Sequence, residues 1–232
     1  MKYIKDVSVV LPAYLEEENL RILLPRIKKN LEELNLNAEI IVVDTPTQMD
    51  GTAAACAEVG VNYINRIGGD TYGCAIRSGI KEACGKKTIF MDSDGSHYPE
   101  FIKQLYALNK DHDVVIASRY IEGGHTENSA ILVFMSKVVN WGYSFVLNIK
   151  CKDVSNSYRL YDTAQLHALK LKCDNFDIVE EILFKLIRQN KNLKIKEIPF
   201  SFKQRMFGET KRNLPKFILT YVFTLIRLRF FT

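Results

Sequence analysis

Apolar residues come in short runs along the first half of the chain, separated by longer stretches with helical spacing. Five runs rich in β-branched residues are candidate strands, at residues 7–12, 39–44, 61–65, 87–92 and 113–118. Four segments between them have helix-compatible spacing, at residues 17–34, 52–59, 72–84 and 99–109. This alternation is typical of βαβ units, so the sequence predicts an α/β fold with a central, mostly parallel sheet flanked by helices.

The second half of the chain is less regular. Residues 129–149 are mostly bulky and apolar, but Lys137 and Asn140 interrupt them, so we expect a buried or interfacial helix and not a spanning one. The pattern then predicts a helix over 177–189, a strand over 195–202 and a terminal helix over 214–230. We expect residues 1–212 to form one domain and residues 213–232 a basic amphipathic helix.

Composition narrows the class of protein. A chain of 232 residues with 47% hydrophobic and 25% charged residues is an ordinary globular domain. Its five cysteines are widely spaced without a CxxC pair, which argues against disulfides or a zinc site and favours the cytoplasm. The apolar run at 7–11 is too short for a signal peptide.

Charge is concentrated at the end of the chain. Residues 191–232 contain ten Lys or Arg and two Asp or Glu, whereas the whole chain has a net charge of +5. This basic tail contains no recognisable nucleic-acid-binding module, so we expect no nucleic acid as partner.

Polar residues cluster where three of the predicted strands end, at residues 12–16, 44–52 and 92–97. The carboxyl ends of parallel strands meet at one edge of a sheet, and ligands bind there. We therefore expect the polar chemistry of the chain to converge on that edge.

The sharpest local signal is a DxD motif, Asp92-Ser93-Asp94, at the end of an apolar strand. Its two carboxylates are hard oxygen ligands that suit Mg²⁺ or Mn²⁺ held between the protein and a diphosphate. Such a cation would neutralise charge on a departing nucleoside diphosphate. A solvated turn is the alternative explanation.

Three further polar residues accompany the motif. Asp44 closes a strand and could accept hydrogen bonds from a nucleobase or ribose. Asp50 suits a helix cap. His97 has no second histidine nearby, which favours a turn-stabilising or supporting role over metal binding.

Four motifs in this order, VSVVLPAYLEEENL, IIVVDTPTQMDGT, FMDSDGSHYPE and ASRYIEGG, resemble the inverting family-two glycosyltransferases of the GT-A fold. The later segment EIPFSFKQRMFGETK is similar to polyprenyl-phosphate sugar transferases of the dolichol-phosphate mannose synthase kind. The resemblance covers about residues 6–212. It implies transfer from a GDP- or UDP-sugar to a polyprenyl phosphate, with inversion and with Mg²⁺ or Mn²⁺ as cofactor.

The resemblance also implies roles for individual residues. The donor would be bound by Pro12, Tyr14, Glu16, Asp44 and Asp92, with Asp92 and Asp94 as metal ligands. The acceptor phosphate would be bound by Arg119, Ser136 and Lys211. Arg205 would fold over a phosphate from the tail and act in catalysis.

Two acids on the predicted helix 177–189 decide between acceptor types. A hydroxyl acceptor needs a carboxylate base, whereas a polyprenyl phosphate is already anionic. Glu180 is our candidate for a base or metal support, with Glu181 or a plain helix surface as alternatives. The runner-up function is a same-fold transferase that glycosylates a hydroxyl of a surface glycan or glycolipid.

Departures from the family pattern keep a third function open. Leu15 replaces the usual Asn, Thr45 replaces a second acid, and Ser96 lies in an altered turn after the DxD. These changes leave a nucleotide-sugar-binding pseudoenzyme as an alternative of another class.

The terminal helix predicts a peripheral membrane protein. Residues 217–226 carry no charge but are half of the roughly 20 needed to span a bilayer. In a helix, Lys216, Thr220, Thr224 and Arg227 form one polar stripe beside a wide apolar face. With the basic tail, this predicts binding to the cytoplasmic face of a membrane. Packing on the domain or a homo-oligomer seam is the alternative.

Overall fold

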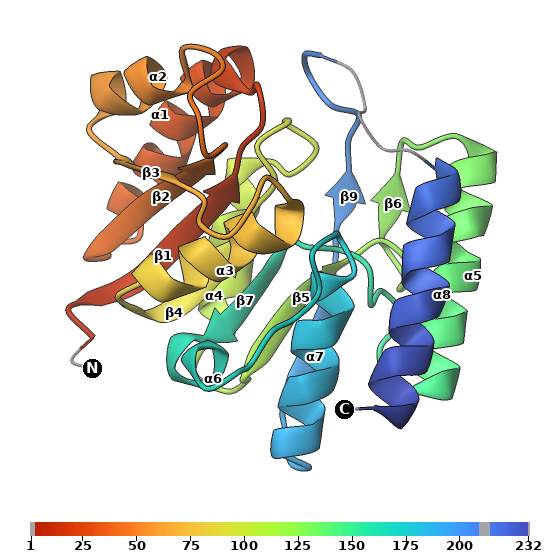
Figure 1. Ribbon diagram of the computed structural model, residues 1–232. Coiled ribbons are helices and arrows are strands. Elements are labelled where there is room, and N and C mark those ends of the chain that lie inside the picture. Colours follow the sequence, from red (N-terminus) through yellow and green to blue (C-terminus); the bar gives the residue numbers. More distant parts are fainter. Residues whose placement is uncertain (1–2, 209–213, 232) are drawn as a thin grey trace.

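A seven-stranded sheet organises the molecule (Figure 1). The computed structural model describes residues 3–208 and 214–231, and for 214–219 only the backbone. The strand order is β3-β2-β1-β4-β7-β5-β8, and only β7 runs antiparallel to its neighbours. The strands are β1 (Lys5–Pro12), β2 (Ala38–Asp44), β3 (Asn62–Asn65), β4 (Gly85–Phe90), β5 (Val114–Ser118), β7 (Arg159–Asp162) and β8 (Ile195–Pro199).

Helices cover both faces of the sheet because its central strands are apolar on both sides. In β1, Val9 belongs to one hydrophobic core and Val10 to the other. The first core is closed by α1 (Glu17–Glu33), α2 (Thr52–Val59), the 3₁₀ turn Pro99–Phe101 and α4 (Ile102–Ala107). The second is closed by α3 (Tyr72–Glu82), α6 (Thr163–His167) and α7 (Ile178–Gln189).

Two long helices, α5 (Ala130–Val146) and α8 (Leu214–Phe230), lie side by side on one flank beside α7 (Figure 1). The Tyr143 hydroxyl of α5 donates to the Tyr221 carbonyl of α8 at 2.7 Å. A separate two-stranded sheet, β6 (His125–Thr126) with β9 (Ser201–Phe202), stands next to them. The terminal helix is thus packed on the domain.

The predicted α/β fold is confirmed, and each of the five predicted strands is present. Two predictions of the second half need correction. The strand expected over 195–202 is two strands, because the chain leaves the main sheet at Phe200, which is buried. The pattern also missed β7, which begins at Arg159, a fully buried residue.

Candidate active site

The predicted convergence of polar chemistry is confirmed by the topology. Pro12, Asp44, Asp92 and Arg119 lie at or just beyond the carboxyl ends of β1, β2, β4 and β5, which run parallel. Because β7 is antiparallel, its amino end lies at this same edge and brings Ser157 there. The site is therefore built from the carboxyl ends of four parallel strands and from the amino end of the antiparallel β7.

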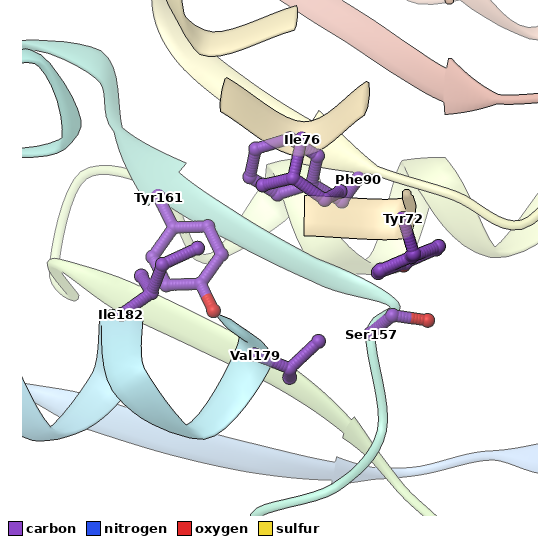
Figure 2. Close-up of a pocket in the computed structure, with 7 residues that line it drawn as sticks. All are labelled: Tyr72, Ile76, Phe90, Ser157, Tyr161, Val179 and Ile182. Carbon is purple, nitrogen blue, oxygen red and sulfur yellow. The ribbon is translucent and has the colours of Figure 1, made fainter. Parts of the chain in front are cut away.

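The carboxylate of Asp92 accepts hydrogen bonds through Oδ1, and its Oδ2 lies 3.8 Å from the Nε2 atom of the buried His97. Its Oδ1 accepts from the Ser157 hydroxyl at 3.0 Å and from the Tyr72 hydroxyl at 3.4 Å. Tyr72 and Ser157 stand at one end of a small, mainly apolar cavity, with Tyr161 and Ile182 at the other (Figure 2). The side chain of Asp92 remains 27% exposed, so part of the carboxylate faces the open edge of the sheet.

Asp94 shapes the turn that follows. Its Oδ1 accepts from the backbone N–H of Ser96 at 3.0 Å and from the Ser96 hydroxyl at 2.6 Å. Gly95 has φ +86°, a conformation that favours glycine, and a Cβ there would lie 2.5 Å from the Met206 side chain. Glycine thus lets Met206 approach the DxD turn.

Residues 203–208, here called the tail loop, close over that turn. The backbone N–H of Met206 donates to the Asp94 carbonyl at 2.8 Å. Arg205 pairs with Glu16 at 2.7 Å, and its Nε donates to the Phe207 carbonyl. Burial raises the pKa of Glu16, and Arg205 partly offsets this effect. Three predicted site residues, Glu16, Asp94 and Arg205, are therefore brought together.

Asn19 of α1 secures the other end of the tail loop. Its Oδ1 accepts from the backbone N–H of Phe207 at 3.2 Å, and its Nδ2 donates to the Phe207 carbonyl at 3.4 Å and to Glu16 at 2.5 Å. Sequence reasoning missed Asn19, because its partners lie either on its own helix or at the far end of the chain.

At the end of β2, Asp44 is buried beside Tyr63. The Tyr63 hydroxyl donates to Asp44 Oδ2 at 3.1 Å, and burial raises the pKa of Asp44. The buried Arg66 guanidinium donates to the carbonyls of Asp44 and Ala13. These two hydrogen bonds connect the end of β2 to the residue that follows β1. Pro12 serves the same edge, since its carbonyl accepts from the Ser93 hydroxyl at 2.7 Å.

The neighbouring residues Tyr14 and Leu15 connect β1 to α1. Tyr14 is half-buried and Leu15 is 40% exposed with φ +56°, the left-handed region that non-glycine residues seldom adopt.

Asp50 contacts the beginnings of two helices. It accepts from the backbone N–H groups of Glu17 and Thr52 at 3.1 and 3.0 Å. Asp50 thus supports the first residues of α1 and α2, but the N-cap residue of α2 is Gly51 and not Asp50.

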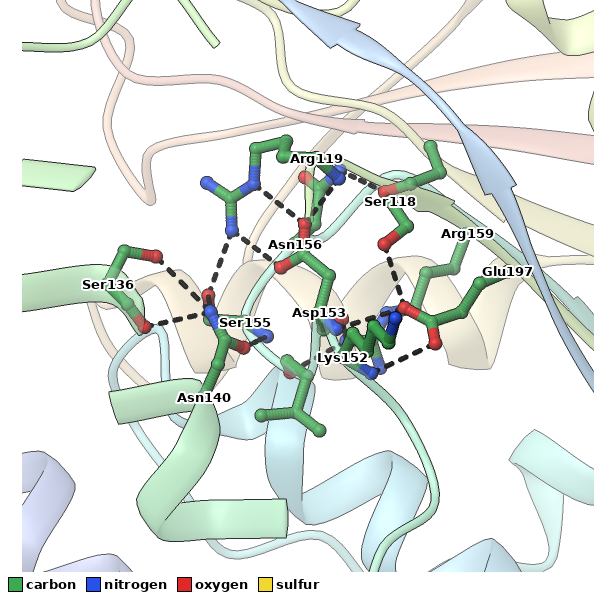
Figure 3. A network of polar contacts seen from close by, with 12 residues as sticks. Ser118, Arg119, Ser136, Asn140, Lys152, Asp153, Ser155, Asn156, Arg159 and Glu197 are labelled. Atoms are coloured by element: carbon green, nitrogen blue, oxygen red, sulfur yellow. Dashed lines mark hydrogen bonds and ion pairs between the residues drawn. The ribbon is translucent and has the colours of Figure 1, made fainter. Parts of the chain in front are cut away.

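Arg119 is the centre of a buried polar network (Figure 3). Its Nε and one terminal nitrogen donate to the Asp153 carboxylate at 2.8 and 2.7 Å, and Ser155 accepts from the same nitrogen at 2.9 Å. Asn140 links Ser155 to Ser136, whose hydroxyl accepts from it at 3.3 Å. The network joins Arg119 and Ser136, the two described residues among the three predicted for the acceptor phosphate. Lys211, the third, lies outside the described residues.

Glu180 lies apart from these groups. It is fully buried on α7, and burial raises its pKa to about 8, an effect that Arg159 opposes. Neither carboxylate oxygen makes a hydrogen bond of ordinary geometry within the described part of the chain. This position does not suit a base that must reach a hydroxyl delivered from solvent. Glu181 instead accepts from Lys185 and from the backbone N–H groups of Lys172 and Cys173.

The DxD turn fits a divalent cation that is shared with a ligand. The described residues contain no group of three or more His, Cys, Asp or Glu side chains arranged to hold a metal. Mg²⁺ is commonly bound by one or two carboxylates together with substrate phosphates. Asp92 and Asp94 would supply the carboxylates, and a diphosphate would supply the remaining oxygens.

A parallel sheet with a DxD turn at its polar edge defines the GT-A glycosyltransferase class, and comparisons agree. The family model for "Glycosyl transferase family 2" matches residues 8–168. The chain belongs to this family.

Its relatives include named polyprenyl-phosphate enzymes. It is 34% identical to the dolichol-phosphate mannosyltransferase of Pyrococcus furiosus over 216 residues, 88% of this chain and 58% of that relative, and thus spans little more than half of that protein. It is 28% identical to the undecaprenyl-phosphate mannosyltransferase of Micrococcus luteus, with coverage of 89% and 87%.

The fold also matches solved structures. One is the glucosyl-3-phosphoglycerate synthase of Mycobacterium tuberculosis with Mn²⁺ and UDP-glucose (TM-score 0.71, 16% identity), which covers 98% of this chain and 80% of that one. At this identity the likeness supports the GT-A fold alone.

Proposed function

We propose that the chain transfers a sugar from a nucleotide-sugar donor to a polyprenyl phosphate, with inversion, at the cytoplasmic face of a membrane. One observation carries the proposal. Arg119, a phosphate-binding type of side chain, lies at the edge that bears the DxD turn and is linked through Asn140 to an exposed apolar helix, α5. The names of the relatives support the same acceptor.

The donor is held from two sides in this proposal. Asp92 and Asp94 bind a Mg²⁺ or Mn²⁺ ion, which stabilises the departing diphosphate when it is bound. Arg205 exchanges its pairing with Glu16 for the diphosphate, since guanidinium binds phosphate oxygens in a bidentate manner. The tail loop thereby covers the donor, and Asp44 contacts the nucleoside.

The acceptor needs no general base. A polyprenyl phosphate is already anionic, so its oxygen attacks the anomeric carbon while the nucleoside diphosphate leaves from the opposite face. Arg119 lies over the Tyr120 ring at 5.0 Å, and Lys137 of α5 lies over the same ring at 5.8 Å. Two cations therefore gather at one ring, next to the network that includes Ser136, and they suit a phosphate.

An apolar surface made by α5 and α8 provides the membrane contact. Its side chains on α5 recur every three or four residues and are 51–72% exposed, namely Ile131, Phe134, Val138, Trp141 and Phe145. On α8 the exposed side chains are Val222, Phe223, Ile226 and Phe230. Within the described chain, no helix has the length and apolar character needed to cross a bilayer.

The terminal helix turns its polar side inward. Thr224 is buried and donates to Asp177, and Arg227 contacts the Cys173 sulfur. Thr224 and Arg227 of the expected polar stripe therefore pack on the domain, and the exposed apolar side chains of α8 point away from it. Large exposed apolar patches mark protein or membrane contacts. The basic tail favours anionic lipid as the occupant.

A transfer assay tests the proposed reaction. Purified protein is incubated with GDP-mannose or UDP-glucose, Mn²⁺ and a short-chain polyprenyl phosphate, and sugar-lipid product is quantified with and without chelator. We expect product that requires both cation and lipid phosphate. Transfer only to a hydroxyl-bearing glycolipid would establish the runner-up function, and donor binding without any transfer would establish a pseudoenzyme.

Vesicle co-sedimentation tests the membrane contact. The structure argues against deleting α8, because Tyr221, Thr224 and Leu228 are buried in the domain. We therefore expect Trp141→Glu to weaken binding to anionic vesicles, with Ile67→Glu as the control, since Ile67 and Trp141 are both 68% exposed. If both variants and the wild type stay in the supernatant at low salt, the surface does not bind lipid, and it is either a homo-oligomer interface or exposed to solvent.

A further inference from the structure

The imidazole of His97 supports the first acid of the DxD turn from the protein interior. His97 is fully buried, and its Nδ1 accepts from the backbone N–H of Asp92 at 3.0 Å. The ring stacks on Tyr158 with centroids 4.6 Å apart, and the edges of Phe200 and Phe202 complete its surroundings. An aromatic box therefore fixes the orientation of the ring.

Hydrogen-bond polarity fixes its tautomer. A backbone N–H can only donate, so Nδ1 carries the lone pair and the proton lies on Nε2. Nε2 then donates to Asn156 Oδ1 at 3.2 Å, which leaves Asn156 Nδ2 to donate to the Ala117 carbonyl at 2.5 Å. This series of three hydrogen bonds begins at the Asp92 N–H and ends at the Ala117 carbonyl. Both are backbone groups of fixed polarity, so one arrangement of protons satisfies all three hydrogen bonds.

This chain of hydrogen bonds spans the site. It starts at the DxD turn beyond β4 and ends at Ala117 in β5, two residues before Arg119. Asn156 also lies between Ser155, which accepts from Arg119, and Ser157, which donates to Asp92. One short segment therefore contacts the metal-binding acid and the acceptor-binding arginine.

We propose that His97 and Asn156 are positioning residues that fix the DxD turn relative to Arg119. They touch neither donor nor acceptor. Their effect is to hold the Asp92 carboxylate where a cation and diphosphate bind, at a set separation from the acceptor phosphate. The proposal rests on the proposed function for its catalytic meaning.

Two substitutions of His97 separate positioning from packing. His97→Phe keeps an aromatic ring in the box but removes the acceptor for the Asp92 N–H. His97→Asn loses ring packing but places an amide oxygen near the position of Nδ1. We expect His97→Phe to be the more stable variant and His97→Asn to be the more active one.

Mn²⁺ affinity provides a readout that does not need turnover. The free Mn²⁺ signal in electron paramagnetic resonance is titrated with protein in the presence of UDP or GDP. Outer-shell substitutions typically cost about 10- to 100-fold in metal affinity or activity. We expect a loss of that size for His97→Phe and a smaller one for His97→Asn. If affinity and kcat instead follow thermal stability, with His97→Phe the better variant, His97 is a packing residue and the proposal is wrong.

Asn156→Ala keeps the test decisive if neither His97 variant folds. It removes two of the three hydrogen bonds without adding volume, and Asn30→Ala is the matched control. Asn30 is 4% exposed against 2% for Asn156, and its amide donates within its own helix, to the Arg26 carbonyl. We expect Asn156→Ala to reduce Mn²⁺ affinity and kcat and Asn30→Ala to leave both unchanged. Equal losses in the two variants would overturn the proposal. Absence of transfer by the wild type would count against the proposed function, and the Mn²⁺ titration would still judge the positioning role.

Discussion

The two halves of the molecule place their polar groups differently. In residues 3–107, the candidate site acids Glu16, Asp92 and Asp94 lie partly exposed at the polar edge of the sheet, and the buried charges Asp44 and Arg66 lie at that same edge. In residues 114–231, charged side chains enter the interior, and Asp153 and Glu180 are each 0% exposed. The first half thus keeps these charged groups at the edge of the sheet, whereas the second half also places charged side chains in the interior of the fold.

The difference predicts how each half responds to substitution. A partly exposed acid such as Asp94 can be changed with little cost to stability, because water replaces its partners. A buried acid cannot, because its partner is left unpaired in a medium that solvates it poorly. The following four predictions test this contrast, beginning with the largest effect.

Asp153→Asn should cost both stability and activity. Asp153 pairs with Arg119, whose side chain is 9% exposed, and breaking a buried pair costs about 3–5 kcal/mol. Urea unfolding measures the loss. Asp174→Asn is the matched control, because its pair with Arg77 has the same 2.7 Å separation but Asp174 is 62% exposed. An exposed pair contributes about 0–1 kcal/mol, so equal losses in the two variants would contradict the contrast.

Asp94→Asn should abolish most activity and leave the fold intact. The amide retains an oxygen for the Ser96 hydrogen bonds but loses the charge that binds a cation, so we expect a loss in kcat of about 10²–10³-fold. Turnover and thermal unfolding are measured on the same preparation. A large drop in the melting temperature, or full wild-type activity in excess chelator, would show that the first half does not separate chemistry from folding.

Glu180→Gln should change how stability depends on pH. The folded pKa of Glu180 is raised to about 8, so the folded protein binds a proton that the unfolded chain releases above about pH 4.5. Its contribution to stability is therefore complete below that pH and is lost as the pH rises towards 8. We expect the variant to gain on the wild type by up to a few kcal/mol between pH 5 and pH 8, measured by urea unfolding.

The adjacent acid provides a control of opposite sign. Burial raises the pKa of Glu181, but Lys185 and two backbone N–H groups more than offset it, so its folded pKa is lowered. Its contribution is present above the unfolded pKa and lost as the pH falls. Glu181→Gln should therefore lose most relative to the wild type at neutral pH. The same pH trend in both variants would refute the assigned charge states.

Leu15→Asn should give a small gain in stability. Among the described residues, Asn35 and Asn148 are the other non-glycine residues with positive φ, and asparagine tolerates that region. We expect a gain of about 1 kcal/mol in thermal unfolding, since a left-handed leucine costs roughly 1–2 kcal/mol. Leu15→Ala keeps the backbone penalty and should show no gain. Lower activity in Leu15→Asn would indicate that the leucine side chain contacts the donor.

The same contrast explains what could be predicted from the sequence. The strands at residues 7–12 and 39–44 are apolar on both faces, and the DxD lies directly after a third strand, so these features are local. The partners of Asp92 were not predicted, because Tyr72 and Ser157 come from 20 residues before it and 65 after it.

Other features that the sequence did not predict involve buried charged residues. Arg159 begins β7, and one of its terminal nitrogens donates to the carbonyls of Asp153 and Val154, an arrangement that no periodicity reveals. For Glu180 and Glu181, the sequence allows a base, a metal support or a plain helix surface, whereas α7 buries both. A hydrophobic pattern assigns charged residues to solvent, and it fails where ion pairs and backbone groups replace water.

The antiparallel strand has a consequence for engineering. Because β5 and β7 are neighbours in the sheet, the chain from 119 to 158 leaves and returns at one edge, as a long excursion between adjacent strands. It carries Arg119, α5 and the segment around Asn156. The two described residues that we propose for the acceptor phosphate, Arg119 and Ser136, thus lie within residues 119–158, and a chimaera that exchanges this segment together with α8, its packing partner, would leave β1, β2 and β4 untouched.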